Sequence, residues 1–233
     1  MATYVMSDLH GQGNLFRAML AKIAFSRADT LYILGDVVDR GPDGIALLRQ
    51  IMDAPNMHLL LGNHEHMMLR YLSPDVTEQE IRRWDRNGNV PTLEGWWRLS
   101  SMQQAKLRAY LTSLPVQRRL TVGQRDFFLV HGFPGETDFE CVWGRPMPEA
   151  PNPIEGTTLI IGHTPVPYML AEREAVPALV EDMAVRGLHP TIFHGPNFID
   201  VDCGCSFPDP IKTLGCLRLE DMAEFYVWNG QEA

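Results

Sequence analysis

The segment Gly35-Asp36-Val37-Val38-Asp39-Arg40-Gly41 places two carboxylates and a guanidinium within five residues. It follows the apolar run 31–34, which is short and bounded by glycine and therefore predicts a buried strand. Open α/β sheets hold their ligands at the carboxyl ends of such strands. Asp36, Asp39 and Arg40 therefore indicate a ligand site. The simpler interpretation is a solvated turn with a surface ion pair, and the segment alone does not decide between the two.

Four other predicted strands end in the same way, with a glycine beside a side chain that can bind a metal ion. The first ends in Asp8-Leu9-His10, and residues two apart in extended chain point to the same side. The others end in Gly62-Asn63-His64-Glu65, His131-Gly132 and Gly162-His163-Thr164-Pro165. A lone histidine is more often structural, but five strand ends that carry such groups are hard to explain by packing.

Together these five segments resemble the motifs of the calcineurin-like metallophosphoesterases. They run from residue 8 to residue 165 in the order of that family. Within the family they are most similar to the bacterial and phage branch of the phosphoprotein (serine/threonine) phosphatases. The resemblance implies an α/β fold in which a two-sheet β-sandwich is flanked by helices. It also implies a metal-dependent phosphoric ester hydrolase.

The resemblance further implies a dinuclear metal centre, in which Asp36 bridges the two ions. The implied ligands of the first metal are Asp8, His10 and Asp36, and those of the second are Asp36, Asn63, His131 and His163. Carboxylate, imidazole and amide ligands without thiolates suit Mn, Fe or Zn, and we expect Mn. A hydroxide between the two ions would attack phosphorus directly, so no phosphoenzyme is expected.

Four further residues receive roles from the same resemblance. Arg40 and Arg145 would bind the oxygens of the substrate phosphate, because a guanidinium can grip them with two hydrogen bonds. His64 would protonate the leaving group, and Asp39 would hold the other nitrogen of its ring. Glu65 is expected to support the metal ligands rather than to bind a metal itself.

The preferred function is a phosphomonoesterase that acts as a serine/threonine protein phosphatase. The alternative is a symmetrical hydrolase of diadenosine tetraphosphate or related dinucleoside polyphosphates, because such an enzyme looks similar at every motif. The two differ in the walls of the cleft, which we expect to come from 66–114 and 132–156. A nucleic-acid phosphodiesterase is disfavoured by the acidic charge and by Pro165, which replaces a second histidine. A catalytically inactive binding module is disfavoured because every motif position is filled.

The composition is that of an ordinary globular chain, with 233 residues of which 45% are hydrophobic and 21% charged. We expect a single domain over 1–233 with a helical insertion at about 66–114. The net charge of −9 argues against nucleic-acid and membrane partners. The expected partner is a phosphorylated protein or a small phosphate ester, and the oligomeric state stays open. The chain shows neither a membrane segment nor a secretory signal, so we expect a cytoplasmic protein with reduced cysteines.

Several helices and strands can be placed from the sequence. Capping-box spacings at Thr77–Glu80 and Ser101–Gln104 predict helices that begin near residues 78 and 102. A helix is also predicted within 171–188, without a role. The strands are expected at 3–7, 30–34, 57–61, 116–122, 126–130, 158–162, 213–219 and 224–228. Residues 198–205 resemble the strand and turn that follow the last ligand in the family.

Overall fold

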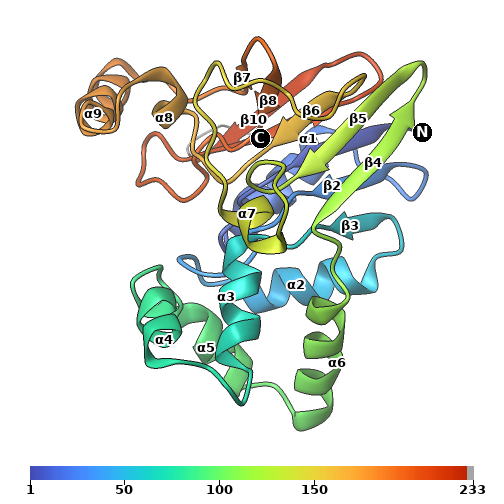
Figure 1. Cartoon of the computed structure of the whole chain (residues 1–233), viewed down its shortest axis with the longest axis vertical. Helices are drawn as coiled ribbons and strands as arrows, with labels where there is room; N and C mark the ends of the chain where they lie inside the picture. Colours follow the sequence, from blue (N-terminus) through green and yellow to red (C-terminus); the bar gives the residue numbers. More distant parts are fainter. Residues whose placement is uncertain (230–233) are drawn as a thin grey trace.

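The computed structural model describes residues 1–229, and its strands form two mixed five-stranded sheets (Figure 1). The first sheet has the order β10-β9-β1-β2-β3, and the second has the order β4-β5-β6-β8-β7. The strands of the first sheet are β1 (Thr3–Met6), β2 (Thr30–Ile33), β3 (Met57–Leu59), β9 (Thr213–Arg218) and β10 (Glu224–Trp228). Those of the second are β4 (Gln117–Val122), β5 (Arg125–Val130), β6 (Thr158–Ile161), β7 (Phe193–His194) and β8 (Phe198–Asp200).

Alternating side chains of each strand pack on opposite faces of its sheet, as the period of two residues requires. Val5 of β1 packs with Phe127 and Leu129 of β5 in one buried cluster that joins the two sheets. Its neighbours Tyr4 and Met6 face the other way and pack against the helices. Because both faces are covered, the central strands read as nearly continuous apolar runs.

Helices cover the outer faces of the sandwich. On the first sheet lie α1 (Gly13–Lys22) and α2 (Gly44–Asp53), whose residues Phe16, Met19 and Leu48 are fully buried. The second sheet is covered by α7 (Asp138–Trp143) and α8 (Pro167–Leu170), and Met169 packs there beside Phe198. The two-sheet α/β fold predicted from the sequence is thus confirmed.

Residues 66–114 contain helices and loops but no strand, and these helices project below the sandwich in Figure 1. They are the greater part of α3 (Asn63–Tyr71), then α4 (Glu78–Asp85), α5 (Val90–Trp97) and α6 (Ser101–Thr112). The predicted cap of α4 is present, since Thr77 and Glu80 form a capping box. The second predicted cap is wrong by one residue, because Ser100 and not Ser101 caps α6. The division of the chain into one domain with an insertion stays a prediction.

The parallel strands bring their carboxyl ends together at one edge of each sheet. β1, β2 and β3 run parallel in the first sheet, and β5, β6 and β8 run parallel in the second. The loops after these strands therefore meet, although they are far apart in the sequence. The helix predicted within 171–188 is present as α9 (Val176–Arg186). No helix of the described residues is long and apolar enough to cross a membrane.

Candidate active site

Two loops that follow neighbouring strands form the floor of the candidate site. The backbone N–H groups of Asp8 and His10 donate hydrogen bonds to the carbonyls of Gly35 and Asp36, at 3.1 and 2.9 Å. The parallel pairing of β1 and β2 thus continues past the ends of the strands. It sets the side chains of Asp8 and His10 beside that of Asp36.

The backbone of the site is strained. Among residues 1–229, eight non-glycine residues have a positive φ, and six of these eight belong to the predicted site. The six are Asp8, His10, Asp36, Asp39, Arg40 and His163. Each such conformation costs about 1–3 kcal/mol and persists only where the surrounding structure enforces it. Gly62 is also required, because a Cβ there would collide with the backbone of Asp36.

The first group of metal-capable atoms comes from these loops. His10 Nδ1 lies 3.1 Å from the carbonyl of Val38, which favours the tautomer with the proton on Nδ1. Nε2 then carries the free lone pair. This atom lies 3.8 Å from Asp8 Oδ1 and 3.8 Å from Asp36 Oδ2. All three side chains are buried. Two carboxylates and a neutral imidazole nitrogen at this spacing are a ligand set for a divalent metal ion.

The second group brings three strand ends together across the two sheets. Ligand atoms of Asp36, His131 and His163 lie within 4.8 Å of one another. Asn63 Oδ1 lies 2.9 Å from His131 Nε2, so all four predicted ligands of the second metal are neighbours. His131 Nδ1 and His163 Nε2 are buried without a hydrogen-bond partner among the described residues. Buried nitrogens are rarely left without a partner. For a metal ion in this group, His131 would offer Nε2, which lies 3.3 Å from Asp36 Oδ1.

The electrostatics of the floor also fit cations. Burial and the guanidinium of Arg40 hold the pKa of His10 well below its usual value, so this imidazole stays neutral and can donate its lone pair. Burial does the same to the pKa of His163. Burial opposes charge on His131 as well, but the Asp36 carboxylate outweighs it and raises the pKa of His131 to about 9. A metal ion would replace that imidazolium as the counter-charge of Asp36.

His64 and Asp39 form a buried pair next to this floor. His64 Nδ1 lies 2.5 Å from Asp39 Oδ2, and His64 Nε2 lies 3.7 Å from Asp36 Oδ2. The Asp39 carboxylate also accepts hydrogen bonds from Trp84 Nε1 and Thr92 Oγ1, both at 2.6 Å. One ring nitrogen of His64 is thus fixed, and the other faces the metal-capable groups.

Glu65 lies beneath the same loop and binds backbone rather than the pocket. Its carboxylate accepts hydrogen bonds from the N–H groups of Asp36 and Val37, both at 2.8 Å, and from that of Gly62. Burial and the nearby Asp36 carboxylate raise the pKa of Glu65 to about 7. The geometry is that of a residue that supports the Asp36 loop.

The two predicted phosphate-binding arginines lie on opposite sides of the floor. Arg40 Nη1 lies 2.8 Å from His10 Nε2, and its Nη2 lies 3.3 Å from His64 Nε2. Arg145 Nη1 lies 3.3 Å from the carbonyl of His163 and 3.3 Å from Thr164 Oγ1. Both guanidinium groups can therefore reach a phosphate that sits over the metal-capable groups.

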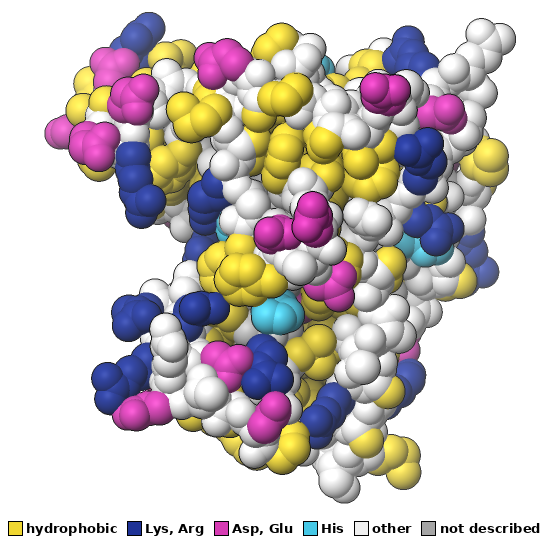
Figure 2. Space-filling model, viewed as in Figure 1, with side chains coloured by type: hydrophobic (Ala, Val, Ile, Leu, Met, Phe, Trp, Pro, Cys, Tyr) yellow, Lys and Arg dark blue, Asp and Glu magenta, His cyan; other side chains and the backbone are white. Residues whose placement is uncertain are grey.

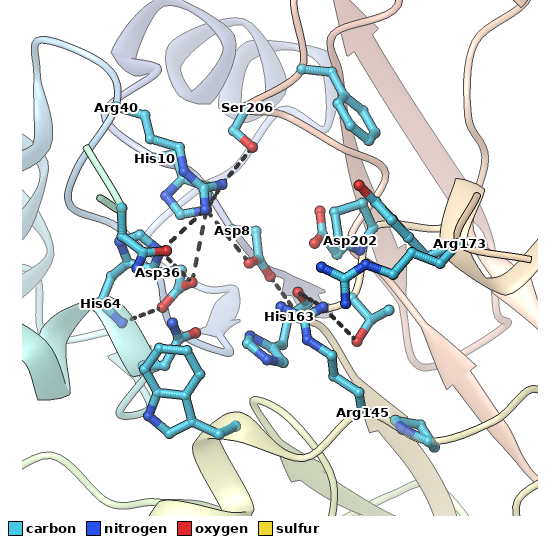
Figure 3. Close-up of a pocket in the computed structure, with 18 of the residues that line it drawn as sticks. Asp8, His10, Asp36, Arg40, His64, Arg145, His163, Arg173, Asp202 and Ser206 are labelled. Atoms are coloured by element: carbon cyan, nitrogen blue, oxygen red, sulfur yellow. Dashed lines mark hydrogen bonds and ion pairs between the residues drawn. The ribbon is translucent and has the colours of Figure 1, made fainter. Parts of the chain in front are cut away.

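These groups open into a cavity of about 380 Å³. Figure 2 shows the molecule notched at the left, with Lys and Arg side chains on both edges of the notch. Asn87, which follows α4, and Arg173, which lies between α8 and α9, both line the cavity. Figure 3 shows the Arg173 side chain beside Asp202, on the side of the cavity opposite Arg40, and the Arg145 side chain beside His163.

The sequence predictions missed several residues of this site. Trp84 and Thr92 follow Asp39 by 45 and 53 residues and reach it only because the helices fold back. Asp202, which lines the cavity, is buried, and burial raises its pKa well above the usual value. Only the Asp-x-Asp spacing of Asp200 and Asp202 after a predicted strand could have indicated this pair. Arg173 carries no local signal in the sequence.

The comparisons with known proteins establish the family. The model of the calcineurin-like phosphoesterase family matches residues 1–187, so the chain belongs to this family. Members of the family use a dinuclear metal centre, and candidate ligands for one are present here. The prediction of a metal-dependent phosphoric ester hydrolase is confirmed at the level of the family.

Curated relatives give a finer comparison. The chain is 35% identical over 133 residues to the symmetrical bis(5'-nucleosyl)-tetraphosphatase of Acidovorax sp. (strain JS42). It is 33% identical over 135 residues to the protein of the same name from Delftia acidovorans. Both matches cover 56% of this chain, and they cover 43% and 44% of the relatives. The matched region thus spans less than half the length of these proteins.

Solved structures share the fold at lower identity. One, described as a candidate diadenosine tetraphosphatase, has a TM-score of 0.62 and 18% identity and covers 98% of this chain and 94% of its own. A metallophosphoesterase from Sphaerobacter thermophilus has a TM-score of 0.56 and 21% identity and covers 100% of this chain and 90% of its own. These likenesses support the fold.

The comparisons overturn the preferred function predicted from the sequence. The expectation of a serine/threonine protein phosphatase is wrong, since the curated relatives are named as tetraphosphatases of nucleotides. The motifs of the two groups are alike because they serve the same metal-assisted attack on phosphorus. They carry no information about what is attached to the phosphate, and that is why the motifs misled.

Proposed function

We propose that this protein hydrolyses dinucleoside tetraphosphates symmetrically, with diadenosine tetraphosphate as the representative substrate. The observation that carries the proposal is the 35% identity over 133 residues to a symmetrical bis(5'-nucleosyl)-tetraphosphatase. Symmetrical cleavage of a four-phosphate chain breaks its central anhydride bond and leaves two phosphates on each product.

The shape and charge of the cavity support a substrate of this kind. Three arginines line it (Arg40, Arg145 and Arg173), on a chain whose net charge is −9. Local positive charge in an acidic protein favours an anionic ligand at that place. Aromatic rings of Trp143, Tyr168 and Phe207 lie around the same cavity. Such rings can stack on nucleobases, which a simple phosphomonoester does not offer.

The residues of the floor suit the cleavage of a phosphoanhydride. Arg40 and Arg145 would hold the non-bridging oxygens of the phosphate under attack, because guanidinium groups bind phosphate with two hydrogen bonds. His64, held by Asp39 at one nitrogen, would deliver a proton from the other to the departing oxygen. Glu65 would keep the Asp36 loop in place. These roles extend the site predicted from the sequence and are part of the proposal.

We propose that two divalent metal ions bind to the site, with Mn as the preferred metal. Asp8, His10 and Asp36 would hold one, and Asp36, Asn63, His131 and His163 the other. When bound, such a pair of ions activates the attacking water and offsets negative charge at phosphorus. Oxygen and imidazole ligands without thiolates also suit Fe and Zn, so metal analysis of the purified protein identifies the native ion.

The test is a side-by-side measurement of kcat/KM with manganese-loaded protein on diadenosine tetraphosphate and on a phosphothreonine peptide. The proposal predicts that the tetraphosphate is preferred by at least about 10²-fold, since non-reacting parts of a substrate supply binding energy only to an enzyme built for them. His64→Asn serves as the control for contaminating phosphatases. Preference for the peptide would contradict the proposal.

A further inference from the structure

Arg173 lies in the connection between α8 and α9, outside the ligands and catalytic residues described above. It lines the cavity together with Tyr168 and Asp202. Figure 3 shows its side chain entering the cavity from the side opposite Arg40. The connection is short, and its position is set by buried residues at both ends, Met169 of α8 and Val176 of α9.

The connection is also tied to the floor of the site. The N–H group of Val166, just before α8, donates a hydrogen bond of 2.9 Å to the carbonyl of Asp202. Val166 is itself buried. The α8–α9 segment therefore starts from a fixed point beside the cavity. The connection between the two helices carries one arginine, Arg173, whose side chain is exposed and lines the cavity.

Arg173 has no counter-charge in the structure as described. Within residues 1–229, no carboxylate oxygen lies within 4.0 Å of its guanidinium, although Glu172 and Glu174 are its neighbours in the chain. An anion bound in the cavity would supply the missing counter-charge.

One phosphate over the floor does not account for this third arginine. Arg40 and Arg145 lie next to the metal-capable groups, where a single phosphate would be attacked. Arg173 approaches from the α8–α9 side, beyond Asp202. A tetraphosphate chain extends past the reacting phosphate on both sides and carries further negative charge there. A guanidinium on that side of the cavity suits such an extended anion.

Resting on the proposed function, we propose that Arg173 binds a phosphate of the tetraphosphate chain that is not the one attacked. It thereby makes the site selective for oligophosphates over simple phosphate esters. Arg173 is a specificity-determining residue in this account, because it contacts the substrate away from the broken bond. The α8–α9 segment, for which the sequence suggested no role, is then the element that carries it.

The first test compares Arg173→Gln with Arg186→Gln. Arg186 is an exposed arginine of α9 that pairs with Asp182 at 3.0 Å and does not line the cavity. We expect Arg173→Gln to raise KM for diadenosine tetraphosphate by about tenfold, as the loss of a charge-assisted pair to phosphate would. Its kcat/KM for p-nitrophenyl phosphate should stay within about twofold, and Arg186→Gln should change neither value. An equal fall in kcat/KM on both substrates would overturn the proposal, and so would an unchanged KM for the tetraphosphate.

A second test does not depend on the proposed reaction. Inorganic tripolyphosphate and orthophosphate are measured as inhibitors of p-nitrophenyl phosphate hydrolysis at constant metal excess. We expect Arg173→Gln to weaken inhibition by tripolyphosphate about tenfold and to leave orthophosphate unchanged, with Arg186→Gln as the control for metal chelation. If the wild-type protein hydrolyses no tetraphosphate, the proposed function fails, but a tripolyphosphate shift still supports oligophosphate binding by Arg173. An unchanged tripolyphosphate inhibition constant contradicts it.

Discussion

The floor and the walls of the cavity are built by different parts of the chain. The floor consists of loops that directly follow parallel strands, and its residues are buried and held by backbone hydrogen bonds between loops. The walls come from the α8–α9 connection and from residues near Asn87 and Trp143, and they are more exposed. In the proposed function, the floor would determine which bond is broken, and the walls would determine what may be attached to the phosphate. This difference is why the motifs predicted the class of phosphoric ester hydrolase correctly but the protein-phosphatase function wrongly.

The largest effect is expected at the centre of the floor. Asp36→Asn should lower kcat/KM by roughly 10³-fold or more, because a group that stabilises charge at the reacting centre typically supplies about 10²–10³ in rate. Bound metal, measured by elemental analysis, should fall below that of the wild type. Asp53→Asn, an exposed carboxylate that pairs with Lys106, is the matched control. Near-normal turnover with full metal content would show that Asp36 does not bridge.

A smaller loss is expected for the pair beside the floor. His64→Asn should lower kcat by about 10²-fold, within the usual range for a general acid. Asp39→Asn should cost less, and the double variant should be no worse than His64→Asn alone, because Asp39 acts through His64. Steady-state kinetics of all three variants check this. If the double variant instead lost kcat by the product of the two single losses, Asp39 would have a role that does not depend on His64.

A still smaller loss is expected at Trp84, which lies on α4 and connects this helix to Asp39 beside the floor. Trp84→Phe removes the N–H that donates to Asp39 Oδ2 at 2.6 Å. We expect kcat to fall by about three- to tenfold, as the loss of a hydrogen bond to a charged group would cause, with KM nearly unchanged. In an Asp39→Asn background the same change should have no further effect on kcat. Trp97→Phe, at an exposed tryptophan, is the control, and an equal loss there would rule out a positioning role.

The smallest effect is expected from thiol modification. All four cysteines are buried, and burial raises the pKa of the Cys203, Cys205 and Cys216 thiols above the usual value. A thiol that stays protonated is a poor nucleophile. Treatment of the folded protein with iodoacetamide near pH 7 should therefore leave kcat unchanged, with labelling followed by mass spectrometry. Inactivation in step with labelling of one cysteine would contradict a site built without thiols.

The floor was predictable from the sequence because its groups are adjacent to strand ends. Apolar runs followed by Asp8, Asp36 or His163 predicted both the strand and the side chain that leaves it, and the structure brings these side chains together. The ends of the predicted strands agree with the structure to within about two residues, whereas the short strand β7 was not predicted. Which loops meet was implied by the parallel pairing of the strands.

The walls were predicted only in part: Asn87 and Trp143 lie in the two segments expected to form them, but several contacts of the site form only in the folded chain. Trp84 and Thr92 reach Asp39 through helix packing, and Arg173 reaches the cavity through the path of the α8–α9 connection. The α6 cap shows the same limit on a local scale. Ser100 and Ser101 are both followed by glutamine three residues later, and only the structure shows that Gln104 instead bonds the carbonyl of Trp96.

The most direct test of the central claim is the identity of the nucleotides released from diadenosine tetraphosphate. Manganese-loaded protein is incubated with this substrate, and the products are separated by chromatography at early times. Symmetrical cleavage predicts ADP as the sole nucleotide product. The Asp36→Asn variant should release no ADP. Equal amounts of AMP and ATP, or intact substrate alongside rapid turnover of p-nitrophenyl phosphate, would contradict the account.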